Sequence, residues 1–283
     1  MHITCLVENA LEGPRMKALP GLEARHGFSL LIETGGNTLL FDMGPDHTLI
    51  GNAEALGIDL TKVDMAILSH GHIDHGGGIA SFQVVNSNAD IYISPDALSP
   101  SAVKMFGFTA KSIGVENVGI DTSRLRPVTA DTKISDHLEL FCHFESDGFI
   151  PKSNRSLFRM KDGDNLEKDD FSHEIALLAR EDGKTVLFTG CSHSGIGNMI
   201  QTVLNRTGLS HIDYVIGGFH LCNPITGLSE SQTRLDTLVA ELERFDRTHF
   251  YSGHCTGLNA YVYLKNILGD RISRVRTGMQ LDL

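Results

Sequence analysis

Short apolar runs alternate with segments of helical periodicity along most of the chain, and the apolar runs recur in pairs joined by turn residues. In the first half, two such runs at residues 28–33 and 38–42 flank the turn sequence Gly35-Gly36-Asn37, a pattern typical of a β-hairpin. Elsewhere in this half the pattern predicts strands at residues 1–8, 63–68 and 89–94, and helices at residues 47–58 and from about 79 onward.

The second half repeats this organisation. Residues 174–179 and 184–189 form a second predicted hairpin around the turn residues Glu181-Asp182-Gly183. Further strands are expected at 211–216 and 248–254, and helices at 196–206 and 229–246. Two halves, each a hairpin followed by strand–helix units, predict a single layered α/β domain over residues 1–283, a four-layer αββα sandwich with a site between the halves.

Residues 95–170 interrupt the pattern. The segment begins with Pro95-Asp96-Ala97-Leu98-Ser99-Pro100 and is rich in glycine, serine and proline, whereas residues 161–170 are charged and turn-prone. We interpret the whole segment as a loop or flap insertion. Residues 161–170 are expected to be a solvated loop, and residues 143–160 a flap that shapes substrate access.

Charge and cysteine content narrow the class of protein. The 24 basic and 35 acidic residues give a formal charge of −11, which disfavours binding to nucleic acid or to an anionic membrane. No stretch approaches the roughly 20 apolar residues of a membrane span, and the N-terminus reads as a strand rather than a signal peptide. The five cysteines are scattered, so we expect a cytoplasmic protein without disulfides. A small molecule is the expected partner, with a homodimer left open.

The segment His70-Gly71-His72-Ile73-Asp74-His75 is the strongest chemical signal, because it places three histidines and a carboxylate directly after a predicted buried strand. Imidazole and carboxylate are ligands for zinc, iron and manganese. In an extended chain His70 and His72 point the same way, while Asp74 and His75 follow as the chain turns. Two differently aimed pairs of ligands suit two metal ions.

Histidines also follow predicted strands in the second half of the chain, namely His193, His220 and His254, and glycines stand beside each of them. Ligand sites of layered α/β folds gather at such strand ends. Any one of these histidines alone is more often structural. Together with residues 70–75, they predict convergence on one centre.

The chain resembles the metallo-β-lactamase fold superfamily in three features: Asp42 at the end of a hairpin strand, the H-x-H-x-D-H pattern of residues 70–75, and the late His254. The resemblance spans nearly the whole sequence and implies an αββα sandwich with a mono- or dinuclear metal site at its edge. It assigns His70 and His72 to one ion and Asp74, His75 and His254 to the other. Asp42 then corresponds to a buried acid that supports the histidine loop without binding metal.

Two positions depart from the usual family pattern. Cys191 stands where a bridging aspartate is usual; its thiolate is able to bind zinc, and the alternative is a small buried thiol. The histidine usually found between residues 70–75 and that position has no clear counterpart. His143 and His173 are candidates, and His193 is the alternative.

Four segments resemble one branch of the superfamily, named for a dihydropterin-linked ribofuranosylaminobenzene 5′-phosphate synthase. They are Arg25-His26-Gly27-Phe28-Ser29, Gly190-Cys191-Ser192-His193-Ser194-Gly195-Ile196, Gly217-Gly218-Phe219-His220-Leu221 and Gly253-His254-Cys255-Thr256-Gly257. The resemblance implies pterin-like or phosphorylated aromatic substrates.

These expectations favour a metal-dependent hydrolase with two divalent ions that activate water, zinc being expected first and iron or manganese remaining alternatives. Asp74 is expected to hold that water as well as to bind metal, while His220 and His26 bind substrate or move protons. Two alternatives stay open: a pterin C–N bond-forming synthase or transferase, and a non-catalytic sensor of metal or ligand.

Overall fold

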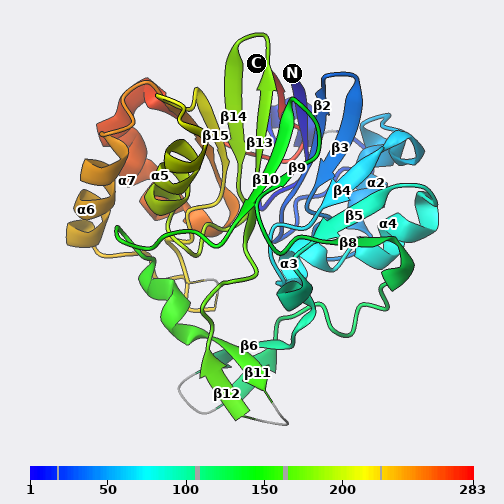
Figure 1. Ribbon diagram of the computed structural model, residues 1–283, viewed down its shortest axis with the longest axis horizontal. Coiled ribbons are helices and arrows are strands. Elements are labelled where there is room, and N and C mark those ends of the chain that lie inside the picture. Colours follow the sequence, from blue (N-terminus) through cyan, green and yellow to red (C-terminus); the bar gives the residue numbers. More distant parts are fainter. Residues whose placement is uncertain (18, 106–108, 162–164, 224) are drawn as a thin grey trace.

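The computed structural model describes residues 1–283 apart from 18, 106–108, 162–164 and 224. Two seven-stranded sheets lie side by side at the centre, each covered on its outer face by helices (Figure 1). This arrangement is the four-layer αββα sandwich that the paired hairpins predict. Among the described residues, no helix is both long and apolar enough to cross a membrane.

The first sheet is built mainly from the N-terminal half of the chain, and its strand order is β18-β1-β2-β3-β4-β5-β8. Its strands are β1 (His2–Val7), β2 (Ser29–Thr34), β3 (Asn37–Phe41), β4 (Met65–Ile67), β5 (Asp90–Ile93), β8 (Leu125–Pro127) and β18 (Gln280–Asp282). The helices of this half are α1 (Gly13–Lys17), α2 (Thr48–Ala55), α3 (Ile73–Gly76) and α4 (Ile79–Val85). The predicted hairpin is β2–β3, and β3, β4 and β5 then run parallel.

The second sheet has the order β17-β16-β15-β14-β13-β10-β9. Its strands are β9 (Thr132–Lys133), β10 (Leu138–Cys142), β13 (Ile175–Glu181), β14 (Lys184–Phe188), β15 (Tyr214–Gly217), β16 (His249–Ser252) and β17 (Ile272–Arg274). Its helices are α5 (Ile196–Thr207), α6 (Gln232–Leu242) and α7 (Leu258–Leu268). The predicted hairpin is β13–β14, and β14 to β17 run parallel.

Three apolar cores separate the four layers. The central core joins the inner faces of the two sheets through side chains such as Phe41 and Phe188, whose ring centroids lie 6.1 Å apart. A second core packs α5, α6 and α7 on one sheet, and a third packs α2 and α4 on the other. Because each sheet buries both faces, its central strands are apolar almost throughout, which explains the unbroken apolar runs of the sequence.

A third, four-stranded sheet is present within residues 95–170, where the sequence predicts a loop or flap. It has the order β12-β11-β6-β7 and consists of β6 (Ser101–Met105), β7 (Thr109–Ser112), β11 (Leu157–Lys161) and β12 (Asn165–Lys168). The solvated-loop prediction for 161–170 is wrong at Lys161, the last residue of β11, and at residues 165–168, which form a strand whose charged residues suit the edge of a sheet. Residues 162–164 of that prediction lie outside the described residues.

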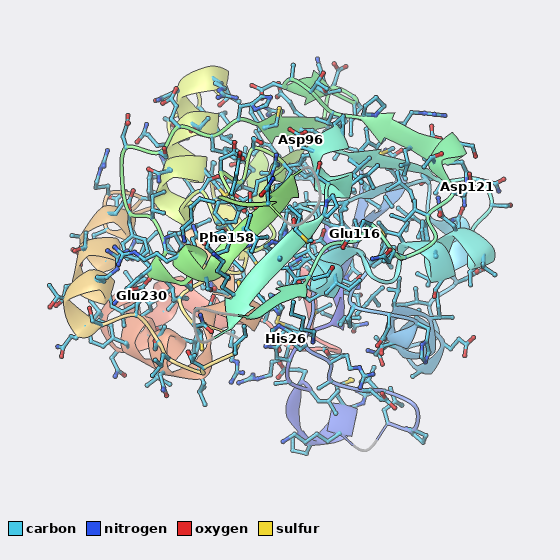
Figure 2. The ribbon with its side chains drawn as sticks, turned by 90° about the horizontal axis from the view of Figure 1, so that it is seen from below. His26, Asp96, Glu116, Asp121, Phe158 and Glu230 are labelled. Atoms are coloured by element: carbon cyan, nitrogen blue, oxygen red, sulfur yellow. The ribbon has the colours of Figure 1, made fainter. Side chains whose placement is uncertain are left out.

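This third sheet, which we call the cap sheet, projects from the sandwich at the bottom of Figure 1 and lies in front of it in Figure 2. Leu157, Val103 and Lys111 are opposite one another on adjacent strands, so their side chains share one face. Lys104 and Phe158 belong to the other face, where the Lys104 ammonium lies 4.4 Å from the centre of the Phe158 ring. One face of the cap sheet therefore carries Leu157, Val103 and Lys111, and the other carries Lys104 and Phe158.

Candidate metal centre

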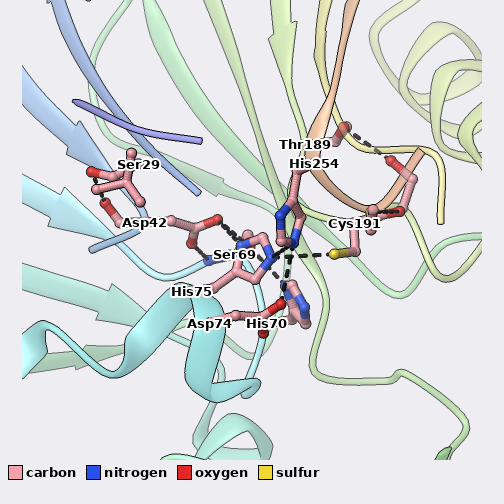
Figure 3. Close-up of polar contacts among 12 residues, drawn as sticks. Ser29, Asp42, Ser69, His70, Asp74, His75, Thr189, Cys191 and His254 are labelled. Atoms are coloured by element: carbon pink, nitrogen blue, oxygen red, sulfur yellow. Dashed lines mark hydrogen bonds and ion pairs between the residues drawn. The ribbon is translucent and has the colours of Figure 1, made fainter. Parts of the chain in front are cut away.

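The candidate ligands lie at one edge of the sandwich, just after the ends of parallel strands. Residues 70–75 follow β4, whereas Cys191 and His193 follow β14, His220 follows β15 and His254 follows β16. Because parallel strands present their carboxyl ends at the same edge, residues about 180 positions apart meet here, as Figure 3 shows for His75 and His254. The structure therefore brings together every metal-binding residue that the sequence predicts.

His70, His72 and His193 form the first group. Their ring centroids are 4.6 Å apart for His70–His72, 5.0 Å for His70–His193 and 4.9 Å for His72–His193, so the three rings surround one point. All three side chains are buried, and none of their Nε2 atoms has a hydrogen-bond partner. A buried nitrogen without a partner is costly. Ligand atoms of His70 and His193 lie within 4.8 Å of each other and of the Cys191 sulfur, a spacing that fits a metal ion, while His72 also shares such a group with Asp169 and His173.

Asp74, His75, Cys191 and His254 form the second group (Figure 3). The Nε2 atom of His75 lies 3.2 Å from the Cys191 sulfur and 3.2 Å from the Nε2 atom of His254, which is 3.2 Å from an Asp74 carboxylate oxygen. Two nitrogens bound at about 2.0–2.1 Å to a tetrahedral zinc are about 3.3 Å apart. The spacing of His75, Cys191 and His254 therefore fits one metal ion, and Asp74 lies beside His254.

Asp42 orients one ligand of each group through its buried carboxylate. Its Oδ2 atom accepts the Nδ1–H of His75 at 2.6 Å and the hydroxyl of Ser69 at 2.7 Å. The Ser69 hydroxyl oxygen in turn accepts the Nδ1–H of His70 at 2.8 Å. Because both imidazoles donate through Nδ1, both present an unprotonated Nε2 to the centre. This placement matches the supporting role expected for Asp42.

Two asparagines play the same part for the second-half histidines, and the sequence gives no signal for them. The Nδ1 atom of His193 lies 3.0 Å from Asn154 Oδ1, and that of His254 lies 3.0 Å from Asn9 Oδ1. In addition, the buried Glu8 carboxylate accepts the backbone N–H of His254 at 2.6 Å. Four candidate ligand histidines thus have Nδ1 hydrogen-bonded, and their Nε2 atoms either have no partner or contact other candidate ligands, which fits a divalent metal ion.

Burial keeps most of these imidazoles neutral. It lowers the pKa of His72 to about 4 and that of His254 to about 4, and it lowers the pKa of His70 and His193 well below the usual range. His75 differs: burial would lower its pKa, but the neighbouring Asp42 and Asp74 carboxylates raise it. Neutral imidazole is the form that binds metal.

The backbone is strained at the centre. The non-glycine residues Asp42, Ser192, His220 and His254 have φ values of 60°, 56°, 49° and 47°. Such left-handed conformations cluster at functional sites, where packing holds them in place. Gly190 allows a close approach between the two halves, since a β-carbon there would lie 2.2 Å from the Ser69 hydroxyl and 2.9 Å from His70 Nδ1.

His26 and His220, the predicted substrate-binding histidines, line a cavity of about 330 Å³ beside the centre. His26 is half exposed, and its Nε2 atom lies 3.3 Å from Asp74. His220 is buried, and neither of its ring nitrogens has a partner. Burial lowers the pKa of His220 to about 3, so its imidazole is neutral at pH 7.

The other two candidates for the missing family histidine take different positions. His143 is exposed and hydrogen-bonds the Thr129 carbonyl, away from the centre. His173 is buried beside the centre, but its Nδ1 accepts the Gly71 N–H at 3.1 Å and its Nε2 contacts Asp169 at 3.3 Å. With both nitrogens of His173 engaged, His193 is the histidine that the geometry offers to the first group.

Comparison with known proteins agrees with this architecture. The family model described as "Metallo-beta-lactamase superfamily" matches residues 22–225. The chain is 27% identical over 275 residues to a 7,8-dihydropterin-6-methyl-4-(β-D-ribofuranosyl)-aminobenzene-5′-phosphate synthase of Methanocaldococcus jannaschii, covering 90% of this chain and 89% of that protein. It is 30% identical over 255 residues to an uncharacterized protein of the same organism, covering 86% of this chain and 89% of the relative.

Solved structures give the same picture. The fold matches the crystal structure of a metal-dependent hydrolase of the β-lactamase superfamily with a TM-score of 0.79 and 25% identity, over 100% of this chain and 99% of that one. It also matches Zn²⁺-bound PqqB from Methylobacterium extorquens with a TM-score of 0.61 and 13% identity, over 100% of both chains. The second similarity concerns the fold alone.

Proposed function

The chain belongs to the metallo-β-lactamase superfamily, and from this premise we propose that it is a metal-dependent enzyme that hydrolyses a small molecule. The observation that supports this most directly is that seven candidate ligands lie at one edge of the sandwich: His70, His72, His193, Asp74, His75, Cys191 and His254. The Cys191 sulfur lies within 4.8 Å of ligand atoms from both groups. A structural role for these side chains would not require three buried Nε2 atoms without partners.

We assign His70, His72 and His193 to one divalent ion, and Asp74, His75, Cys191 and His254 to a second. Zinc suits a set that includes a thiolate, with iron or manganese as alternatives. When bound, such ions lower the pKa of a water ligand to about 7 and polarise an electrophilic carbonyl or phosphorus. The chain itself orients the ligands through Asp42, Asn9 and Asn154.

His220 and His26 act on the substrate in this proposal. His220 supports this role because it faces the cavity as a neutral imidazole with both nitrogens available. A neutral imidazole is able to accept a proton at one nitrogen or to donate one from the other. His26, which contacts Asp74 and is half exposed, exchanges protons between that carboxylate and solvent.

A second candidate function is C–N bond formation, in which the amine nitrogen of a phosphorylated aromatic substrate displaces a leaving group from a carbon of a pterin-like substrate and loses its proton. The similarity to the M. jannaschii synthase over 90% of this chain favours it. In that reaction the phosphate stays on the product, whereas a phosphatase would release it. Phosphate release therefore separates a phosphatase from the synthase.

Metal content per chain tests the proposal. We expect elemental analysis of protein purified without chelator to give about two zinc or iron ions per chain. Cys191→Ala and His193→Ala should each lower that value by about one. Cys142→Ala is the matched control, since Cys142 is equally buried in β10 and belongs to neither group. Wild-type protein near zero, and not restored by added zinc, iron or manganese, would contradict the proposal.

Turnover gives the second test, with a panel of phosphoesters, lactones and pterin derivatives. His220→Ala should lower kcat by about 10²–10⁴ at saturating metal, the usual contribution of a general acid or base. Its metal content should equal that of wild type. If His220 is only structural, the variant will lose stability without a selective loss of turnover.

A further inference from the structure

The cavity beside the metal centre has two kinds of wall. Loops of the sandwich contribute polar side chains, among them His26, Asp74 and His220. The other wall comes from the cap sheet, because its Val103, Lys111 and Leu157 also line the cavity. Figure 2 shows the cap sheet lying over the sandwich with His26 near it. The cap sheet therefore forms a roof over the predicted site of chemistry.

The roof is a single row of residues across three strands. Leu157 of β11 pairs with Val103 of β6, which pairs with Lys111 of β7. Opposite residues on adjacent strands present their side chains to the same face, so the row faces the cavity as a unit. The remaining aliphatic lining is Ile73, Ile113 and Ile225.

Lys111 is the one lysine or arginine among the described residues that line this cavity. None of the described carboxylates lies within ion-pair distance of its ammonium, in contrast to Arg159 on the same sheet, which is 3.3 Å from Asp169. At the floor, the buried His220 has two ring nitrogens without partners. Within the described part of the chain, the cavity thus offers a cation without a carboxylate partner in its roof, ring nitrogens without hydrogen-bond partners in its floor, and aliphatic side chains between.

Resting on the proposed function, we propose that this cavity takes a small organic anion with an apolar, ring-sized body, and that Lys111 binds its anionic group. The aliphatic residues contact the body, and His220 contacts the group that reacts. A volume of about 330 Å³ is at the small end of ligand pockets, which favours a compact molecule over a polymer. Carboxylate and phosphate both satisfy a lysine ammonium.

Calorimetric titration of the metal-loaded full-length protein tests this assignment with four probes: phenyl phosphate, benzoate, neutral benzamide and inorganic phosphate. We expect one or both aryl anions to bind at least tenfold more tightly than benzamide and than inorganic phosphate. Lys111→Met should weaken the binding of the aryl anions about 10–100-fold, which is the contribution of one charge-assisted hydrogen bond. Lys111→Arg should restore part of that affinity.

Lys104→Met is the matched control, because Lys104 belongs to the same cap sheet but to its opposite face. It should change affinity by less than twofold. Equal loss in Lys104→Met and Lys111→Met, or equal binding of benzamide and the aryl anions, would overturn the inference. Preference for phenyl phosphate over benzoate supports a phosphorylated ligand, and the reverse supports a carboxylate.

Failure of this inference is distinguishable from failure of the proposed function. Metal content does not depend on how Lys111 acts in binding the probes. Wild-type protein with two ions that shows no anion preference overturns the anion site alone. Protein that binds aryl anions through Lys111 but holds no metal supports the anion site and contradicts the metal-dependent hydrolase.

Discussion

Replacing Asp42 with asparagine should weaken both metal sites while the fold is retained. The carboxylate accepts three hydrogen bonds: Oδ1 from the Ser69 N–H at 2.7 Å, and Oδ2 from the Ser69 hydroxyl at 2.7 Å and from His75 Nδ1–H at 2.6 Å. An amide of the same shape has only one oxygen. Whichever way it is placed, its NH₂ group faces at least one of these donors, so a buried donor loses its acceptor.

The size of the effect follows from that lost acceptor. A buried donor left without a partner costs about 1–3 kcal/mol. If the amide NH₂ faces His75, the imidazole relieves the conflict by moving its proton from Nδ1 to Nε2, which then no longer binds metal. Changes to the residue behind a metal-binding histidine typically lower metal affinity 10–100-fold, which is about 1.4–2.8 kcal/mol.

Competition with a colorimetric zinc chelator measures this loss. Asp42→Asn should affect both ions because Asp42 contacts His75 directly and His70 through Ser69. Ser69→Ala removes only the hydroxyl that links Asp42 to His70, so it should weaken mainly the binding of the ion that His70 holds. Asp213→Asn is the control, because Asp213 is also a carboxylate that accepts two hydrogen bonds, both from Thr185. Asp213 lies just before β15, whereas His220 and the metal centre lie beyond the other end of that strand. A folded Asp42→Asn protein with wild-type zinc affinity would refute the reasoning.

Three further outcomes are expected. Gly190→Ala should lose the ion held by His70, because its β-carbon would lie 2.2 Å from the Ser69 hydroxyl, whereas Gly51→Ala, with nothing within 4 Å, should retain wild-type metal content by elemental analysis. Removing metal with a chelator should lower Tm by roughly 8–16 °C for each ion that is present at about 1,000 times its Kd, and re-addition should restore it; an unchanged Tm by calorimetry would contradict tight binding. Burial raises the pKa of Asp169, but His173 and other neighbours outweigh it and lower that pKa to about 2. The stability lost in Asp169→Asn should therefore be fully visible by urea unfolding above about pH 4 and disappear as the pH falls through about 2, and a difference constant down to pH 2 would contradict this.

Much of the architecture could be predicted because the responsible patterns are local. The unbroken apolar runs identify central strands, and the ligands at residues 70–75 are adjacent in sequence just after one of them. Parallel strands then bring His193 and His254 to the same edge. These parts of the prediction needed only periodicity and strand direction.

The cap sheet was not predictable in the same way. Its strands are short, and β6 pairs with β11 about fifty residues later. Lys104 and Lys168, which lie on the same face as Phe158, break the apolar pattern that marks a buried strand. Asn9 and Asn154 were missed for a related reason: an isolated amide has no signature until the histidine that it contacts is placed.

The 3₁₀ helix Lys152–Ser156 joins the cap sheet to the metal centre, because β11 begins at the very next residue. Asn154 of this helix contacts the His193 ring and donates to the His193 carbonyl at 2.8 Å, while the Ser153 hydroxyl donates to the His220 carbonyl. Residues that anchor the roof thus also hold a ligand and the floor of the cavity. Thermodynamic reciprocity then applies: by whatever factor metal strengthens the binding of a molecule under the roof, that molecule strengthens the retention of metal by the same factor.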